Sequence, residues 1–227
     1  MTSIRKEILA INEIYHVYNR GVEQRPIFVD KFDYARAIKI LDYYRFDKLP
    51  LGFFDFINLP QDKRENITTP LLQTESFRVN ILSFSLMPNH FHLLLRQKTE
   101  NGISSFISDF SNSHAKYFNS KNSRVGSLFQ RPFHARRIET PEQLVHVSRY
   151  IHINHVSNYL IEDEALDNYP RTSMPEYLGK VKNKICETET VLSHFNSIQD
   201  YRGFVHDQVG YARELEKIKH LAIDFRE

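Results

Sequence analysis

Cysteine, tryptophan and long apolar runs are scarce or missing in this sequence of 227 residues. The single cysteine, Cys186, cannot form an internal disulfide, which excludes a disulfide-stapled secreted scaffold and a zinc site built from cysteines. No stretch approaches the ~18 consecutive apolar residues of a membrane-spanning helix, and the first residues contain no apolar signal-peptide core. We therefore expect a cytoplasmic protein that has no membrane partner.

An excess of one charge is also missing overall, because 30 Lys and Arg residues stand against 28 Asp and Glu residues. A net charge of +2 does not by itself identify a polyanionic partner. Between positions 116 and 149, however, seven basic residues stand against only Glu139 and Glu142. The basic residues are Lys116, Lys121, Arg124, Arg131, Arg136, Arg137 and Arg149. The composition, 41% hydrophobic and 26% charged, excludes a disordered chain, and the length of 227 residues predicts one domain or one domain with an appendage.

The hydrophobic pattern predicts both strands and helices. Strands are expected over residues 15–20, 78–87 and 90–96, the last two joined by a turn at Pro88-Asn89, and residues 126–138 are expected to be extended. Helices are expected after a cap at Asp30 or Asp33, then over the ranges 103–119, 141–155, 188–195 and 200–223. Residues 46–76, interrupted by prolines and a glycine, are expected to form a long surface insertion.

Two histidines stand two positions apart in the strand that starts at residue 90. Side chains alternate between the faces of a strand, so His90 and His92 share one face while Phe91, Leu93 and Leu95 share the other. Two neutral imidazoles that share a small space suit a divalent metal ion. The alternative interpretation is a half-buried strand with two incidental histidines, and the pattern alone does not exclude it.

A second group of polar residues lies on the helix expected over 141–155. Leu144, Val147 and Ile151 form its apolar stripe, whereas Tyr150 and Asn154 are neighbours at i and i+4 about a quarter turn away. If the apolar stripe packs on the sheet, a tyrosine hydroxyl and an oxygen-bearing third ligand reach the edge of the histidine pair. The alternative is a surface flank with a half-exposed tyrosine.

Several motifs together resemble a known family. MPNHFHLLL is similar to the signature of the HUH endonucleases, in the branch of single-tyrosine transposases that includes the REP-associated tyrosine transposases. YHVYNRG, KYFNSK, RVGSLFQRPFHARRI and SRYIHINHVSNYL follow the order and spacing of that family, over roughly residues 12–180. Where relatives often continue with Asn-Pro-Val, this chain has Asn154-His155-Val156, so the helix is expected to run on further.

The resemblance implies an active site and a reaction. His90, His92 and Asn154 would bind a divalent metal, Mg²⁺ or Mn²⁺, and Tyr150 would be the nucleophile that cleaves and rejoins single-stranded DNA through a 5′-phosphotyrosine. Tyr117 is the rival nucleophile. Its i+4 neighbour is Lys121, which would repel a cation, so packing or base stacking is the preferred interpretation of Tyr117.

The resemblance also implies a fold and partners. We expect an α+β fold, an antiparallel ferredoxin-like (RRM-like) sheet with helices on one face, over residues 1–180, and a C-terminal helical tail over residues 181–227. The expected partner is single-stranded or hairpin DNA. A monomer is favoured, although some single-tyrosine transposases pair their sites across a dimer.

Basic and aromatic residues between the motifs are candidates for contacts with DNA, since cations neutralise phosphates and aromatic rings stack on bases. The candidates are Asn19, Arg20, Lys116, Tyr117, Arg124, Phe129, Arg131, Phe133, Arg136 and Arg137. Two rival functions stay open at this point. One is a non-catalytic nucleic-acid-binding protein on the same fold, and the other is a hydrolytic metal nuclease in which Tyr150 only stacks on a base.

Overall fold

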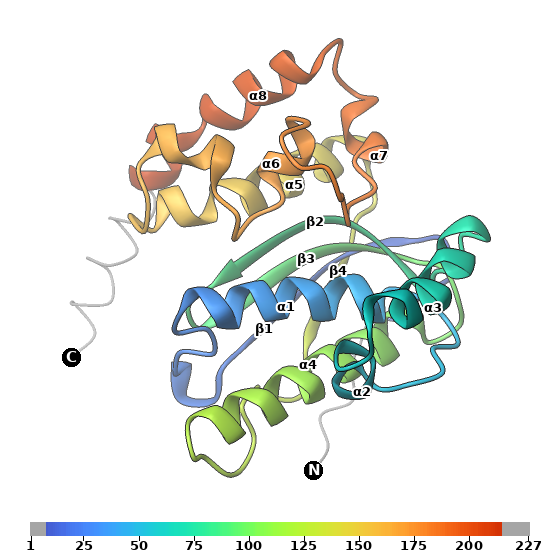
Figure 1. Cartoon of the computed structure of the whole chain (residues 1–227). Coiled ribbons are helices and arrows are strands. Elements are labelled where there is room, and N and C mark those ends of the chain that lie inside the picture. Colours follow the sequence, from blue (N-terminus) through green and yellow to red (C-terminus); the bar gives the residue numbers. More distant parts are fainter. Residues whose placement is uncertain (1–7, 215–227) are drawn as a thin grey trace.

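A computed structural model describes residues 8–214 as an α+β fold around one four-stranded antiparallel sheet (Figure 1). The strands are β1 (Ile14–Arg20), β2 (Val79–Met87), β3 (His90–Gln97) and β4 (His134–Arg137), in the order β2-β3-β1-β4. Helix α1 (Lys31–Tyr44) connects β1 to β2, and α4 (Gly102–Lys121) connects β3 to β4. This is the βαββαβ order of the ferredoxin-like fold, which confirms the predicted fold class.

The turn at Pro88-Asn89 joins β2 to β3 as predicted, and the loop after β1 holds it in place. The backbone N–H of Gly21 donates to the Asn89 carbonyl at 2.8 Å, and the N–H groups of Ile27 and Phe28 donate to the Pro88 carbonyl at 2.8 and 3.1 Å. A short 3-10 turn, Val22–Gln24, lies within that loop. These bonds fix where β3 begins, and therefore which of its residues face which side of the sheet.

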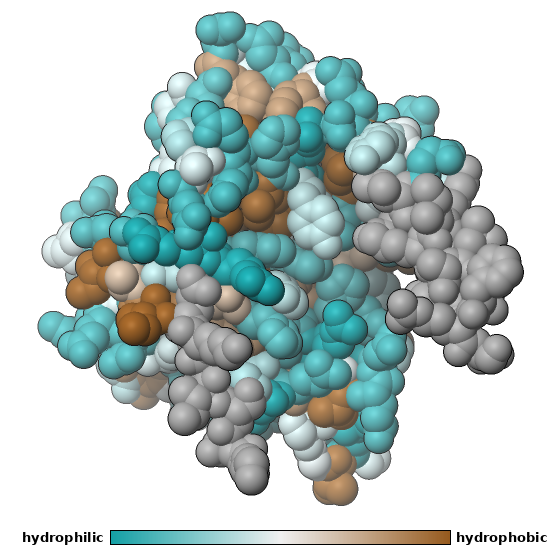
Figure 2. Space-filling model, turned by 180° about the vertical axis from the view of Figure 1, so that it is seen from behind, coloured by the Kyte–Doolittle hydropathy of each residue, from teal (hydrophilic) through white to brown (hydrophobic). Residues whose placement is uncertain are grey.

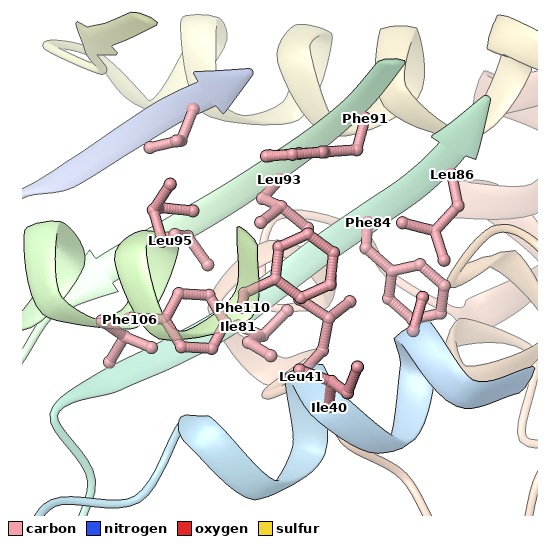
Figure 3. Close-up of a cluster of buried hydrophobic side chains, with 14 of the residues drawn as sticks. Ile40, Leu41, Ile81, Phe84, Leu86, Phe91, Leu93, Leu95, Phe106 and Phe110 are labelled. Atoms are coloured by element: carbon pink, nitrogen blue, oxygen red, sulfur yellow. The ribbon is translucent and has the colours of Figure 1, made fainter. Parts of the chain in front are cut away.

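Helices α1 and α4 cover the first face of the sheet and enclose the main hydrophobic core (Figure 1, Figure 3). In Figure 3, Leu93 and Leu95 of β3 lie among Ile40 and Leu41 of α1 and Phe106 of α4. Ile81 reaches the same core as Phe84 although their spacing is odd, because a β-bulge shifts the register of β2 between Ile81 and Ser83.

Local signals in the sequence start α1 at the expected place. Asp30 is the N-cap, and its carboxylate accepts from the backbone N–H groups of Phe32 and Asp33. Asp33 closes a reciprocal capping box by accepting from the N–H of Asp30, so both predicted caps take part. Lys121 of α4 pairs with both carboxylates and thereby ties the end of α4 to the start of α1.

The second face of the sheet is also covered in part, which corrects the expectation of helices on one face only. Helix α5 (Pro141–Ser157) packs on β2 and β3 through Leu144, Ile151 and Val156, with Thr140 as N-cap and Pro141 in its first turn. The helix extends two residues past the predicted end at 155. Because Leu82 and Leu94 point away from the main core, this face needs its own apolar cover.

The C-terminal elements complete this second hydrophobic cluster. They are a 3-10 segment, Asp163–Asn168, and the helices α6 (Met174–Tyr177), α7 (Glu189–Leu192) and α8 (Ile198–His206). Tyr177, Val191 and Tyr201 are fully buried in it together with Leu94 of β3. The helix predicted over 200–223 ends at His206, a further helical stretch covers 209–214, and the remainder lies outside the described residues.

The predicted insertion at 46–76 contains two helices, α2 (Phe53–Ile57) and α3 (Gln61–Gln73). Phe53 and Phe56 are buried against α1, whereas α3 buries none of its residues and carries Pro70 in its last turns. The prolines and charged residues concealed the helical pattern. Of the helices in the described part of the chain, none is long and apolar enough to cross a bilayer.

A buried polar network fastens α8 to α5. The Tyr201 hydroxyl lies 2.5 Å from Ser148 Oγ and 2.8 Å from His152 Nδ1, and His152 Nε2 lies 2.8 Å from Ser173 Oγ. All four side chains are buried. Ser148 and His152 stand two positions before and two positions after residue 150, so the network fixes the rotation and height of α5 on the sheet.

Removing one hydroxyl tests this network. Tyr201→Phe is expected to lower the free energy of unfolding by about 1–3 kcal/mol, because Ser148 and His152 each lose a buried hydrogen-bond partner. Urea denaturation measures the change, with Tyr211→Phe as the control, since Tyr211 is 63% exposed. Equal stability of the two variants would show that the hydroxyl contributes no net stabilisation.

Candidate functional site

His90 and His92 lie on the second face of the sheet, in the part of that face that α5 leaves uncovered. The register of β1 on β3 places Tyr18 opposite His92 and Arg20 opposite His90, so these side chains share the face. Phe91, Leu93 and Leu95 alternate with them and are fully buried on the opposite side. The predicted separation of the imidazoles from the core side chains is what the structure shows.

Each imidazole is oriented through its Nδ1 atom. His92 Nδ1 lies 2.9 Å from Nε2 of His16 on β1, and His90 Nδ1 lies 2.6 Å from Oδ1 of Asn89 in the turn. The centroids of the His90 and His92 rings are 5.0 Å apart, with the rings nearly perpendicular. A histidine that is anchored by one nitrogen leaves the other for a ligand, so Nε2 is the atom that each ring would offer to a metal.

Burial keeps these rings neutral. It lowers the pKa of His16 and of His90 to about 4, with the Arg20 guanidinium adding to the effect on His90. The pKa of His92 lies well below its usual range, first because the ring is desolvated and then because His16, His90 and Arg20 are nearby. A neutral imidazole has a lone pair to donate, so at physiological pH the rings are in the protonation state that a metal requires.

Tyr150 of α5 meets the histidine pair. Its ring centroid is 5.4 Å from that of His92 and 6.0 Å from that of His16, in both cases edge to face, and the residue is 44% exposed. A cavity of about 460 Å³ lies between them. It is lined by His16, Tyr18, Asn19, Arg20, His90, His92, Arg136 and Tyr150. This lining contains two arginines and no carboxylate, so the cavity suits an anion such as a phosphate.

Asn154, the predicted third ligand, lies one helical turn after Tyr150. It is only 3% exposed, and within residues 8–214 its Nδ2 atom has no hydrogen-bond partner. It does not line the cavity. A buried amide without a partner has unused hydrogen-bonding capacity. A half rotation of the side chain exchanges the positions of the amide oxygen and nitrogen. Its chemistry therefore fits a ligand group, and its place on α5 is next to the site.

The predicted ligands are few for a divalent ion. The described part of the chain contains no group of three or more His, Cys, Asp or Glu side chains that could hold a metal. Two imidazoles and one amide oxygen are a sparse set, and Mn²⁺ tolerates two imidazoles better than Mg²⁺ does. Such a set leaves coordination positions for phosphate oxygens and fits a site completed by the substrate.

His155 follows Asn154 on α5, and the structure gives it a packing role. Its Nε2 lies 2.9 Å from the Leu86 carbonyl and its Nδ1 3.2 Å from Ser85 Oγ, and the ring is fully buried. Burial lowers its pKa to about 3. The side chain thus bonds α5 to β2, and the helix continues past Asn154 as expected.

A larger cavity of about 980 Å³ lies between α4 and the loop at 126–133. Five of the predicted DNA-contacting residues line it: Asn19, Lys116, Phe129, Arg131 and Phe133. Asn19 also lines the smaller cavity, and it is the one residue that the two linings share. Its amide donates to the Gln130 carbonyl at 3.0 Å, which ties the loop to β1. Figure 2, which views the molecule from behind relative to Figure 1, shows a mostly hydrophilic surface with hydrophobic residues in separate patches.

The other candidates for DNA contacts have different neighbours. Arg20 and Arg136 line the smaller cavity, whereas Arg124 bonds to Asn119 and Arg137 pairs with Glu13. Tyr117 lies on α4, facing α1, with the Arg36 guanidinium 4.5 Å above its ring. Tyr117 lines neither cavity, so the structure does not bring the rival nucleophile to the histidine pair.

Three residues of this face were missing from the sequence prediction: His16, Tyr18 and His134. His16 and Tyr18 occur in YHVYNRG, and their alternation with buried Val17 indicated that they share a face with each other. What the sequence did not show is which strand lies beside β1. Its pairing with β3 brings His16 to the histidine pair, and its pairing with β4 places His134 beside Tyr18.

Comparisons with known proteins agree with the geometry. Residues 63–154 match the family model described as "Transposase IS200 like", a range that includes His90, His92, Tyr150 and Asn154. A solved structure titled "Structure of the REP associates tyrosine transposase bound to a REP hairpin" is similar over 82% of this chain and 90% of that chain, with a TM-score of 0.52 and 13% identity. No curated protein matches the chain. The resemblance to single-tyrosine transposases is thus confirmed in sequence, and the fold is shared.

Proposed function

We propose that this protein cleaves and rejoins single-stranded DNA by transesterification, with Tyr150 as the nucleophile and a divalent metal at His90, His92 and Asn154. One observation carries the proposal most directly. The only aromatic hydroxyl that α5 presents to the cavity lies edge-on to His92, in a cavity whose lining carries two guanidinium groups and no carboxylate. Similarity to an IS200-like transposase model supports the same reaction class.

The residues divide the work of the reaction. Arg20 and Arg136 bind the scissile phosphate and balance its charge. His90, His92 and Asn154 would hold a divalent ion, which would supply Lewis-acid chemistry at that phosphate. The Tyr150 oxygen attacks phosphorus and loses its proton, the bond from phosphorus to the 3′ oxygen breaks, and the leaving 3′ oxygen takes up a proton to become the 3′-hydroxyl. The product is a 5′-phosphotyrosine.

The same geometry accounts for rejoining. A covalent phosphotyrosine keeps the energy of the phosphodiester bond, so attack by another 3′-hydroxyl restores DNA without a nucleotide cofactor. Helix α5 packs on the sheet of its own chain, so one chain contains the histidines and the tyrosine together. We therefore propose that the monomer is the active unit, with a DNA hairpin bound in the larger cavity beside the site.

The test is a covalent adduct. Single-stranded oligonucleotides that contain hairpins, labelled at either end, are incubated with the protein and Mn²⁺ and separated on denaturing gels. We expect a slowly migrating band that carries label only from the fragment 3′ to the cut, and that needs the metal. Mass spectrometry of the peptide is expected to place the phosphotyrosine at Tyr150.

Two other outcomes would assign a different function. Binding of hairpins with no cleavage over a broad panel of sequences would identify a non-catalytic nucleic-acid-binding protein. Cleavage that leaves no protein-linked fragment would identify a hydrolytic nuclease. Either result would overturn the proposed reaction, and the first would leave the assignment of the cavities to DNA unchanged.

A further inference from the structure

A pair of stacked aromatic rings lies beside the histidine pair on the same face of the sheet. Tyr18 of β1 and His134 of β4 are directly opposite in the register. Their ring centroids are 4.9 Å apart and their planes differ by 15°, so they stack face to face with a small tilt. Tyr18 is half-buried, whereas His134 is exposed.

These rings continue the aromatic surface of the cavity outward. The Tyr18 ring centroid is 5.8 Å from that of His92 and 5.3 Å from that of His16, and His92 in turn contacts Tyr150. A row of rings therefore runs from the nucleophile to the edge strand and ends on the exposed imidazole of His134.

Two arginines flank the row of rings, each two residues along the strand from a stacked ring. Arg136 is two residues after His134 and Arg20 two residues after Tyr18, and side chains two apart lie on one face. Both arginines line the cavity. A phosphate held there leaves the base of the neighbouring nucleotide within reach of the stacked pair, because base and phosphate are joined through one sugar.

We propose that Tyr18 and His134 form a stacking platform for one unpaired nucleobase next to the phosphate in the cavity. The proposal rests on the proposed function, which supplies the phosphate. The chemistry selects an unpaired base, since a duplex buries the flat faces of its bases while a single strand exposes them, and every base has such a face. A cross-strand contact that only stabilises the sheet edge is the alternative.

The two interpretations differ in what the DNA must contain. The binding probes are a fluorescein-labelled 12-mer of thymidine and a 12-mer of equal phosphate count with abasic sites throughout, titrated by anisotropy against the Tyr150→Phe protein, which binds without cutting. We expect the thymidine strand to bind more tightly. Adding His134→Ala is expected to weaken its binding by about tenfold, the scale of one base–aromatic stack, and to leave the abasic strand unchanged.

Matched variants separate stacking from charge and from folding. His134→Phe keeps a flat ring and is expected to retain the preference for bases. His146→Ala removes an exposed histidine that does not line the cavity, and should change neither affinity. Thermal melting of each variant checks the fold, so that a loss of binding is not a loss of structure.

Three results would overturn the platform. An equal loss of affinity for both DNA strands after His134→Ala would show that the residue contacts phosphate. No loss of affinity for either strand would show that the pair only stabilises the sheet edge. A parent protein with no preference for thymidine over abasic DNA would also exclude it. Because the binding assay needs no cleavage, a base-dependent effect in it, together with no covalent adduct from the wild-type protein, would refute the reaction and keep the platform.

Discussion

Tyr150→Phe is expected to abolish the covalent adduct and strand cleavage while leaving hairpin affinity nearly unchanged. The substitution removes only the attacking oxygen, and the ring keeps its edge contacts with His16 and His92. A nucleophile that forms the covalent intermediate has no substitute within the step, so its loss costs the whole rate enhancement of that route. Denaturing gels measure cleavage, and anisotropy measures affinity.

Two matched variants make this result specific. Tyr159→Phe removes the hydroxyl of a tyrosine that is 52% exposed just after α5 and is expected to cleave normally. Tyr117→Phe tests the rival nucleophile and is also expected to cleave. An adduct that persists in Tyr150→Phe and disappears in Tyr117→Phe would exchange the two roles, whereas unaltered cleavage without an adduct would point to attack by water.

His92→Ala is expected to reduce metal-dependent cleavage by about 10³-fold, since Lewis-acid stabilisation of a phosphoryl transition state is worth several kcal/mol. His16→Ala is expected to cost less, roughly 10- to 100-fold, because His16 contacts the His92 ring at Nδ1 and would orient the proposed ligand without being one itself. This order of effects distinguishes a ligand from the residue that positions it.

The measurement is single-turnover cleavage over a range of Mn²⁺ concentrations. His16→Ala should recover part of its activity at high Mn²⁺ concentration, because the substitution weakens the affinity for the metal. His92→Ala should not recover. His194→Ala, at an exposed histidine after α7, is the control. Wild-type rates in His92→Ala at every metal concentration would contradict the metal role of the pair.

The strands and helix α5 were predictable because their signals are local. Alternation placed His90 and His92 on one face of β3, and Thr140 with Pro141 marked the start of α5. The periodicity of α5 separated Tyr150 from the stripe that packs on the sheet. Each of these inferences needs only the residues of one element and its cap.

The remaining features depend on which elements meet. His16 reaches His92 only through the pairing of β1 with β3, and the cover on the second face depends on Tyr201, which is 53 residues away from Ser148. A hydrophobic pattern indicates that a face is buried, but it does not indicate which element of the chain covers that face. The second helical layer therefore appeared only with the structure, although Leu82 and Leu94 already required one.

The hairpin turn at Pro88-Asn89 limits how the length of this protein can vary. Side chains alternate with a period of two, so one residue gained or lost between the turn and β3 would send both imidazoles into the core and expose Phe91. The backbone bonds from Gly21, Ile27 and Phe28 resist that slip. Helix α3, in which no residue is fully buried, lacks this restraint, so insertions and deletions are more tolerable there than at the turn.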